Sequence, residues 1–372
     1  FLLLAAADLI AQPDTGENTA DREFELADSL MGVRAFDQAI PLLLEASSAY
    51  QQNNNSARYV DCLILLANSY FQQYQWEMCK EYADKSLAYS LKEFGDQSLY
   101  VARCYLILGR YQQVAQKNKE ALQYFQQTID IIEKNNHDDR KSLIEANNYS
   151  ARSYYILSNS EKSLQSLQKA IEISIELHGV EAPGTINLMI NKGVIYYGSS
   201  QLKKSLEVYQ SMLPVLSDTS LHHQSLLIKL YNNMGNTYLA LGEYQSALAS
   251  LLQSIAINEK INGKNSKVSP NSLFVIASTY VLLGKYDQAE GVLEKGKKLV
   301  LELFGENHPL MVSYAYDMAT ILMKQDKYEE ALAHQRKALE ISYQNGFDVF
   351  RSYGFLVNTL IESAKYEEAL EV

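Results

Sequence analysis

The chain has 372 residues, which is more than one compact core normally holds, and its apolar content of 47% excludes a wholly disordered protein. Its formal charge of −11 disfavours nucleic acid as a partner, because phosphate binding needs a basic face. With only 6 Pro and 17 Gly the composition favours helices, and 27 Tyr against 11 Phe indicate repeated use of an amphipathic ring.

The first residues, FLLLAAADLIAQ, form an apolar run that resembles the end of a secretory signal peptide. Asp8 interrupts this run and neither Met nor a basic residue precedes Phe1, so the alternative is a frayed first helix. We predict a signal-peptide remnant and linker over residues 1–19, and hence an exported, periplasmic or extracellular chain; the alternative predicts a cytoplasmic one. No run approaches the ~20 apolar residues of a membrane helix, so no membrane span is expected.

From residue 20 to the end one short pattern recurs, in which an anchor residue, often aromatic, is followed three positions later by a small residue. KYEEAL occurs at 327–332 and again at 365–370, and steps of forty-two residues lead backwards from the first copy. Only the first and last steps deviate, at forty and thirty-eight residues. Such spacing indicates a repeat architecture. The nine repeats, numbered in chain order, are anchored at Phe36, Trp76, Asn118, Ser160, Leu202, Tyr244, Tyr286, Tyr328 and Tyr366.

Each anchor is preceded by one amphipathic helical pattern and begins a second. In repeat 6, Met234, Gly235 and Tyr238 share a face, a tight turn follows at LGEY, and Ala247 and Leu251 line the next helix. A side chain larger than Ala or Ser at position 235 or 247 would hold the two helices apart. The neighbouring Tyr rings would fill the remaining space. The sequence therefore predicts an all-α solenoid of about nine helix pairs over residues 20–372.

The pattern resembles tetratricopeptide (TPR) repeats, from about residue 20 to the end. The segment GENHPLMVSYAYDMATILMKQDKYEEALAHQRKALEI at 305–341 resembles the kinesin-light-chain type, which also has a 42-residue period. The resemblance implies a right-handed α-α superhelix in which the first helix of each pair lines a concave groove. Ser160 and Leu202 replace the aromatic anchor, so the packing of repeats 4 and 5 is in question. Repeat 9 stops early in its second helix, which predicts a fragment of a longer chain.

The sequence carries no motif of a catalytic or cofactor site. GxGxxG, Walker-type, GxSxG, HExxH and CxxC patterns are all absent. The three cysteines, Cys62, Cys79 and Cys104, fall at packing positions, and the repeat register places no His near them. We therefore expect no enzyme activity, no cofactor and no metal site in this chain.

The remaining candidate for function is the groove that the TPR resemblance implies. Asn recurs at groove positions, and its amide can bind the backbone of an extended peptide as donor and acceptor together. Arg and Lys at other groove positions would attract an acidic segment or a C-terminal carboxylate. The alternative is that these are ordinary solvated residues. The candidates are Asn68, Phe71, Arg103, Arg110, Asn148, Arg152, Tyr155, Asn187, Tyr197, Lys229, Asn232, Asn236, Asn271, Phe274 and Tyr316.

We expect an interaction scaffold that binds a protein or peptide segment. The repeats resemble the N-terminal TPR array of bacterial CHAT-domain proteins, in which a caspase-like protease domain follows the array, and this resemblance implies the recognition part of such a chain. One alternative is an extracytoplasmic sensor array with a histidine kinase or DNA-binding output, and another is a stand-alone scaffold. These alternatives rest on analogy between families.

Overall fold

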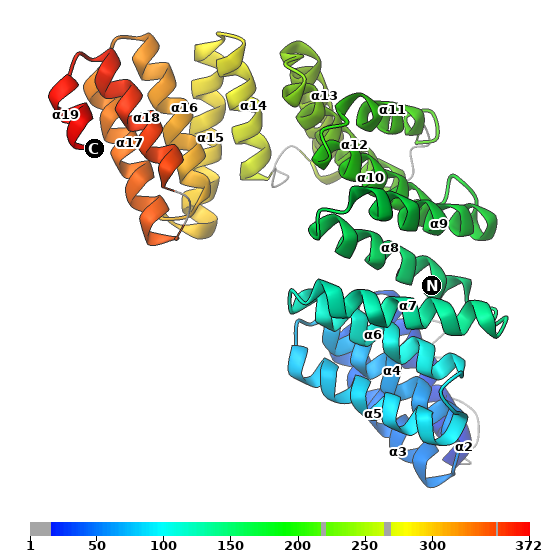
Figure 1. Cartoon of the computed structure of the whole chain (residues 1–372). Coiled ribbons are helices and arrows are strands. Elements are labelled where there is room, and N and C mark those ends of the chain that lie inside the picture. Colours follow the sequence, from blue (N-terminus) through cyan, green and yellow to red (C-terminus); the bar gives the residue numbers. More distant parts are fainter. Residues whose placement is uncertain (1–15, 217–220, 264–268, 347–348) are drawn as a thin grey trace. The chain divides into compact units, whose positions relative to one another are not determined.

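The structure is a computed structural model that describes residues 16–216, 221–263, 269–346 and 349–372. All regular elements in these ranges are α-helices, and no strand occurs among them (Figure 1). The all-α prediction is therefore confirmed. None of the described helices is both long enough and apolar enough to cross a bilayer. The apolar run at residues 1–12 lies outside the described residues, so the signal remnant stays a prediction.

Within the described ranges, eighteen helices follow one another as nine pairs joined by tight turns. The first helices of the pairs are α2 (Gly16–Gly32), α4 (Ser56–Gln72), α6 (Leu99–Val114), α8 (Arg140–Ile156), α10 (Pro183–Gly198), α12 (Leu221–Ala240), α14 (Pro270–Leu282), α16 (Leu310–Lys324) and α18 (Phe350–Glu362). The second helices are α3 (Phe36–Gln52), α5 (Trp76–Phe94), α7 (Asn118–Lys134), α9 (Ser160–His178), α11 (Leu202–Met212), α13 (Tyr244–Asn262), α15 (Tyr286–Phe304), α17 (Tyr328–Gln344) and α19 (Tyr366–Glu371). Every anchor residue is the first residue of a second helix.

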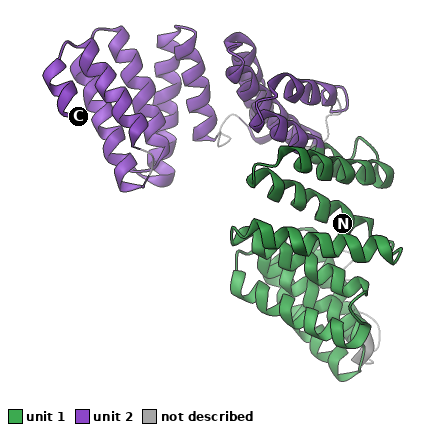
Figure 2. Cartoon of the chain, viewed as in Figure 1, with its two compact units in different colours: residues 1–188 green, residues 189–372 purple. Residues whose placement is uncertain are grey.

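The chain divides into two compact units, residues 1–188 and 189–372, which Figure 2 shows in different colours. The boundary falls inside α10, in repeat 5, and the sequence did not predict it. In unit 1 the first helices α2, α4, α6 and α8 contact one another in succession. In unit 2, α14 contacts α16 in the same way. In unit 1 the first helices therefore form a layer of their own, beside the second helices, and α14 and α16 repeat this contact in unit 2.

The turn inside every pair has one residue with a positive φ, always two positions before the anchor. At Gly284, for example, φ is 68°, and the N–H of Lys285 donates to the carbonyl of Tyr280 at 2.9 Å, closing the turn. Only two of the nine positions carry Gly, which adopts this conformation without strain. The nine residues are Arg34, Tyr74, Gln116, Ser158, Ser200, Gly242, Gly284, Asp326 and Ala364.

The two helices of a pair approach each other at a small residue. A Cβ added to Gly235 would lie 2.7 Å from Cγ of Leu251, and one added to Gly193 would lie 2.2 Å from Cε1 of Tyr209. Such separations are far below van der Waals contact, so even Ala is too large at these positions unless the partner side chain moves. The space at position 235 is therefore narrower than the sequence analysis indicated, because the side chain of Leu251 fills it.

Repeats 4 and 5, which lack the aromatic anchor, keep the same close approach with serine. The Ser163 hydroxyl donates to the carbonyl of Ala151 at 2.7 Å, and the Ser205 hydroxyl donates to the carbonyl of Gly193 at 2.8 Å. Each bond joins the second helix to its own first helix. Both serines are fully buried, and a buried hydroxyl needs such a partner. Local packing in these repeats is therefore preserved.

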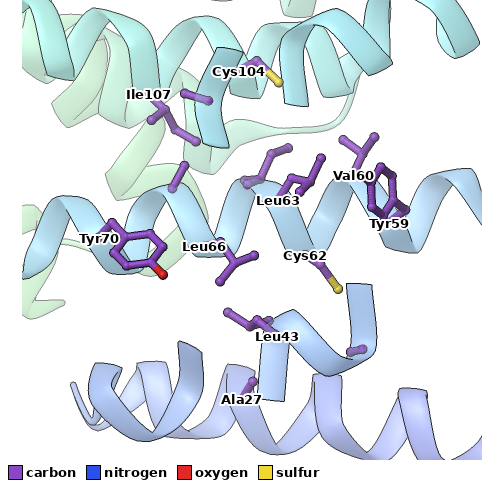
Figure 3. Packing of buried hydrophobic residues seen from close by; sticks show 14 of the residues in the cluster. Ala27, Leu43, Tyr59, Val60, Cys62, Leu63, Leu66, Tyr70, Cys104 and Ile107 are labelled. Atoms are coloured by element: carbon purple, nitrogen blue, oxygen red, sulfur yellow. The ribbon is translucent and has the colours of Figure 1, made fainter. Parts of the chain in front are cut away.

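The three cysteines lie in the core of unit 1. Figure 3 shows Cys62 and Cys104 beside the apolar side chains of α4, and Cys79 belongs to the same cluster. All three are 0% exposed. Burial raises the pKa of Cys62 to about 12 and that of Cys79 and Cys104 to about 11, so these thiols stay protonated at neutral pH. They are packing residues, as expected.

Two glycines of repeat 7 test the turn geometry. A Cβ would meet no atom within 4 Å at Gly284 or at Gly291, but Gly284 has a φ of +68° whereas Gly291 lies inside α15. We expect Gly284→Ala to lower the free energy of unfolding by about 1 kcal/mol, because a left-handed conformation strains any residue with a Cβ. Gly291→Ala should raise it by about 1 kcal/mol, through helix propensity. Urea denaturation of both variants measures the signs, and equal signs would contradict the turn assignment.

Candidate functional site

A cavity of about 360 Å³ opens along the first helices of unit 1. Residues of α2, α4, α6 and α8 line it, and three of the predicted groove residues are among them: Asn68, Arg103 and Arg110. The two arginines lie seven residues apart on α6, which places them two turns apart, about 10 Å along the helix. They therefore occupy different parts of this cavity, which we call the Arg110 cavity.

Arg103 is held between two carboxylates. Its Nε donates to Oδ2 of Asp139 at 2.8 Å, and its Nη1 lies 3.9 Å from Oδ1 of Asp61. Asp139 also caps the N-terminus of α8 and accepts hydrogen bonds from the backbone N–H and the hydroxyl of Ser142. Burial raises the pKa of Asp139, but the bonds from Arg103 and Ser142 outweigh it and hold this pKa below its ordinary value. The charge of Arg103 is therefore neutralised inside the protein, which weakens its predicted role in attracting an acidic ligand.

Arg110 has no such neutralisation. Its side chain is buried, at 7% exposure, with the guanidinium carbon 4.2 Å from the ring centroid of Phe71 and 5.3 Å from that of Tyr149. Nη1 donates to Oδ1 of Asn68 at 2.8 Å, whereas Nε has no partner. Within the described residues, Arg110 forms no ion pair. Because a buried charge is costly unless it is paired, an anion in this cavity would stabilise Arg110.

Four further groove candidates of unit 1 do not line the Arg110 cavity. Arg152 occupies on α8 the position that Arg110 has on α6, but it is exposed. Asn187 donates from Nδ2 to the carbonyl of Pro183 in its own helix, at 3.0 Å. Asn148 and Tyr155 are partly exposed on α8. These residues are accessible at the surface without being brought together in one cavity.

In unit 2, Phe274 was wrongly predicted to face the groove. It is 2% exposed, and its ring covers Gly296, where an added Cβ would lie 2.5 Å from Cε1 of Phe274. Its position in the repeat equals that of Asn232 and Tyr316, which are partly exposed, so periodicity alone could not separate them. An apolar ring turns into the core where a glycine leaves room for it. The exposed candidates of unit 2 are Tyr197, Lys229, Asn236 and Asn271.

A second cavity, of about 270 Å³, lies between α14, α16 and α18 in unit 2, and we call it the Asp317 cavity. Tyr316 lines it, as predicted for a groove residue, but its most unusual member is Asp317, which the sequence analysis missed. The Asp317 carboxylate accepts a hydrogen bond from the hydroxyl of Ser278. Burial raises the pKa of Asp317 to about 6, although the bond from Ser278 and the charge of Arg351 lower it.

Comparison with known proteins identifies the repeats. The tetratricopeptide repeat family matches residues 59–134, 142–218, 226–302 and 276–343, which together are more than half of the chain. The chain therefore belongs to the tetratricopeptide repeat family, and as such an array it is a protein-interaction scaffold.

The individual relatives either match this chain over a small part of their length or have low sequence identity to it. The Clustered mitochondria protein homolog of Homo sapiens is 29% identical over 114 residues, which are 30% of this chain and 9% of that protein. The apo form of RapI is similar in structure, with a TM-score of 0.67 at 13% identity over 94% of this chain and 98% of RapI. A Rap protein complexed with Competence and Sporulation Factor has a TM-score of 0.54 at 16% identity, over 95% of this chain and 99% of the Rap protein. Nearly identical repeats of a putative kinesin light chain from Podosopora anserina have a TM-score of 0.47 at 20% identity, over 55% of this chain and 97% of that chain. At these identities the likeness to RapI and to the Rap protein shows the fold.

The raised pKa of Asp317 predicts a pH-dependent cost in stability. The folded state holds the proton of Asp317 more tightly than the unfolded state, so stability falls as the pH rises from about 4 through 6 and then levels off. Asp317→Asn removes this cost. We expect the variant to melt at a higher temperature than the wild type at about pH 8, and the difference to vanish near pH 4.

Asp139, whose pKa is lowered, gives the opposite expectation and serves as the control. Asp139→Asn should melt below the wild type at neutral pH, and that difference should shrink as the pH falls through the pKa of folded Asp139. Thermal denaturation followed by circular dichroism measures both variants. A lower melting temperature of Asp317→Asn at high pH would contradict the assignment.

Proposed function

We propose that this scaffold binds a peptide or protein segment along the first helices of unit 1, and that a carboxylate of the segment pairs with Arg110. The observation that carries the proposal is a buried guanidinium that lines a cavity and forms no ion pair within the described residues. A carboxylate can accept two parallel hydrogen bonds from a guanidinium, which is the strongest pairing open to Arg110.

The charges of the cavity orient such a segment. Asp61 and Asp139 line it near Arg103, two helical turns from Arg110, and would repel a ligand carboxylate there. Near Arg110 the neighbours are the amide of Asn68 and the ring of Phe71, which carry no charge. Asp28 also lines the cavity, but it belongs to α2, whereas Arg110 belongs to α6. An acidic side chain or a C-terminal carboxylate would therefore lie at the Arg110 position. The remaining backbone would extend towards Arg103.

The structural likeness to a Rap protein complexed with Competence and Sporulation Factor supports a ligand-binding role for a chain of this fold. It supplies no residue of the present site, because the two chains are 16% identical. The ligand class rests on Arg110 alone. A recognition role before a CHAT-type protease-like domain, a sensor array before a signalling output, and a stand-alone scaffold are the further proposals from family analogy. The coding sequence beyond residue 372 distinguishes them.

Arg110→Gln tests the carboxylate site, and Arg152→Gln is a matched control at the equivalent, exposed position of the next repeat. The probes are degenerate acetylated hexapeptide pools, synthesised with either a free or an amidated C-terminus and with Asp, Asn or Ala fixed at one position. We expect carboxylate-bearing pools to bind the wild type at least about tenfold more tightly than Arg110→Gln, the range for a hydrogen bond to a charged partner.

Binding to Arg152→Gln should equal that of the wild type, because the exposed guanidinium is already solvated. Fluorescence anisotropy of labelled pools measures the affinities. Equal affinity of both variants, or of carboxylate and amide pools for the wild type, would refute the proposed site.

A further inference from the structure

The Asp317 cavity combines a carboxylate with a pair of aromatic rings. Tyr316 and Phe355 are stacked, with ring centroids 4.5 Å apart, and the Tyr316 hydroxyl lies 2.5 Å from Oγ of Ser352, which fixes the ring. Asp317, the next residue of α16, lines the same cavity. A carboxylate attracts a cation directly, and an aromatic face adds to that attraction through its quadrupole.

The carboxylate of Asp317 forms no ion pair among the described residues. The hydroxyl of Ser278 donates a hydrogen bond to it, and the charge of Arg351 lowers its pKa without outweighing the effect of burial. Part of the free-energy cost of desolvating the Asp317 carboxylate is therefore not offset within the protein. A ligand cation beside the carboxylate would offset it.

Arg351 already places a guanidinium against the two aromatic rings. Its guanidinium carbon lies 5.7 Å from the ring centroids of both Tyr316 and Phe355, within the range of cation–π attraction. Arg351 is exposed on α18 and forms no ion pair with Asp317 among the described residues. It holds a guanidinium against these rings without neutralising the carboxylate. A second cation that entered the cavity would be repelled by Arg351 and attracted by Asp317.

We propose that the Asp317 cavity binds the guanidinium of an arginine side chain, carried by a peptide or protein segment that lies along the first helices of unit 2. A planar guanidinium can stack on a ring and donate two hydrogen bonds to a carboxylate, whereas a lysine ammonium cannot stack. The volume of about 270 Å³ suits one side chain rather than a larger cofactor. This site shares no residue with the Arg110 cavity, and its proposed binding group is a carboxylate rather than a guanidinium.

Binding should weaken as the pH falls through about 6, the pKa to which burial raises Asp317. The elements packed around Asp317 present Ser278 from α14, Ser342 from α17 and Arg351 from α18, besides Tyr316 on its own helix. Asp317 is the one carboxylate among the described residues that line this cavity, and no histidine lines it. The pH dependence therefore follows the ionisation of one carboxylate.

The probes are three acetylated and amidated pentapeptides with two Gly on each side of Arg, Lys or citrulline, which is the neutral isostere of arginine. NMR titration of the whole chain with each peptide measures binding into the millimolar range. At about pH 8 we expect the Arg peptide to bind, the Lys peptide to bind several-fold more weakly, and the citrulline peptide not to bind. At about pH 5 the affinity for the Arg peptide should be about tenfold lower.

Three variants separate this site from others. Asp317→Asn should lower the affinity for the Arg peptide at least about tenfold, because the charged acceptor is lost. Arg351→Gln changes an exposed residue and should raise the affinity, since it removes the repelling cation. Arg110→Gln should leave it unchanged, so that failure of this proposal and failure of the carboxylate site give different results.

The proposal is overturned if no peptide binds, or if the citrulline peptide binds as well as the Arg peptide. It is equally overturned if Asp317→Asn binds the Arg peptide with wild-type affinity, or if Arg351→Gln binds it more weakly. Circular dichroism melts of each variant confirm that the compared proteins are folded.

Discussion

Close approach between the two helices of each pair is the contact on which the rest of the structure depends. Where the first helix has Gly, as at Gly193 and Gly235, a large side chain of the second helix fills the space that a Cβ would need. Where the second helix has Ser, as at Ser163, its hydroxyl bonds to a carbonyl of the first helix. Both solutions place a small residue at the contact, because packing limits how near two backbones can lie. In unit 1 the first helices α2, α4, α6 and α8 contact one another in succession and form a layer.

Equivalent positions recur in every first helix, but the side chains at these positions and their partners differ. Arg103 and Arg110 lie on one helix and line one cavity, yet the first is paired with two carboxylates and the second with an amide and two rings. The difference comes from neighbouring repeats: α8 supplies Asp139 beside Arg103, and Tyr149 beside Arg110. A repeat scaffold thus builds individual sites by varying the residue at a fixed place. Fold and site are therefore specified by different positions of the repeat.

The sequence predicted the helix pairs because their signals are local. All nine anchors begin second helices, including Ser160 and Leu202, which lack the aromatic ring. The site was predicted only in part, because burial and ion pairing depend on partners from other repeats. Phe274 shares its repeat position with Tyr316 but is buried over Gly296. Asp139 could have been found as a helix N-cap, whereas Asp317 lies at a repeat position that the groove pattern excludes, and nothing local distinguishes it.

Arg110 and Asp317 form no ion pair among the described residues, whereas other charged residues of this fold do. Charged partners in successive repeats lie somewhat less than one repeat apart in sequence, as with Arg103 and Asp139 or with Arg336 and Glu368. One acidic residue on α8 could serve Arg110 in the same way, and one basic residue on α18 could serve Asp317. Instead Tyr149 lies beside Arg110, and Arg351 contacts the rings rather than the carboxylate. A buried charge without an ion-pair partner lowers stability, and the two proposed ligands would offset that cost at Arg110 and Asp317.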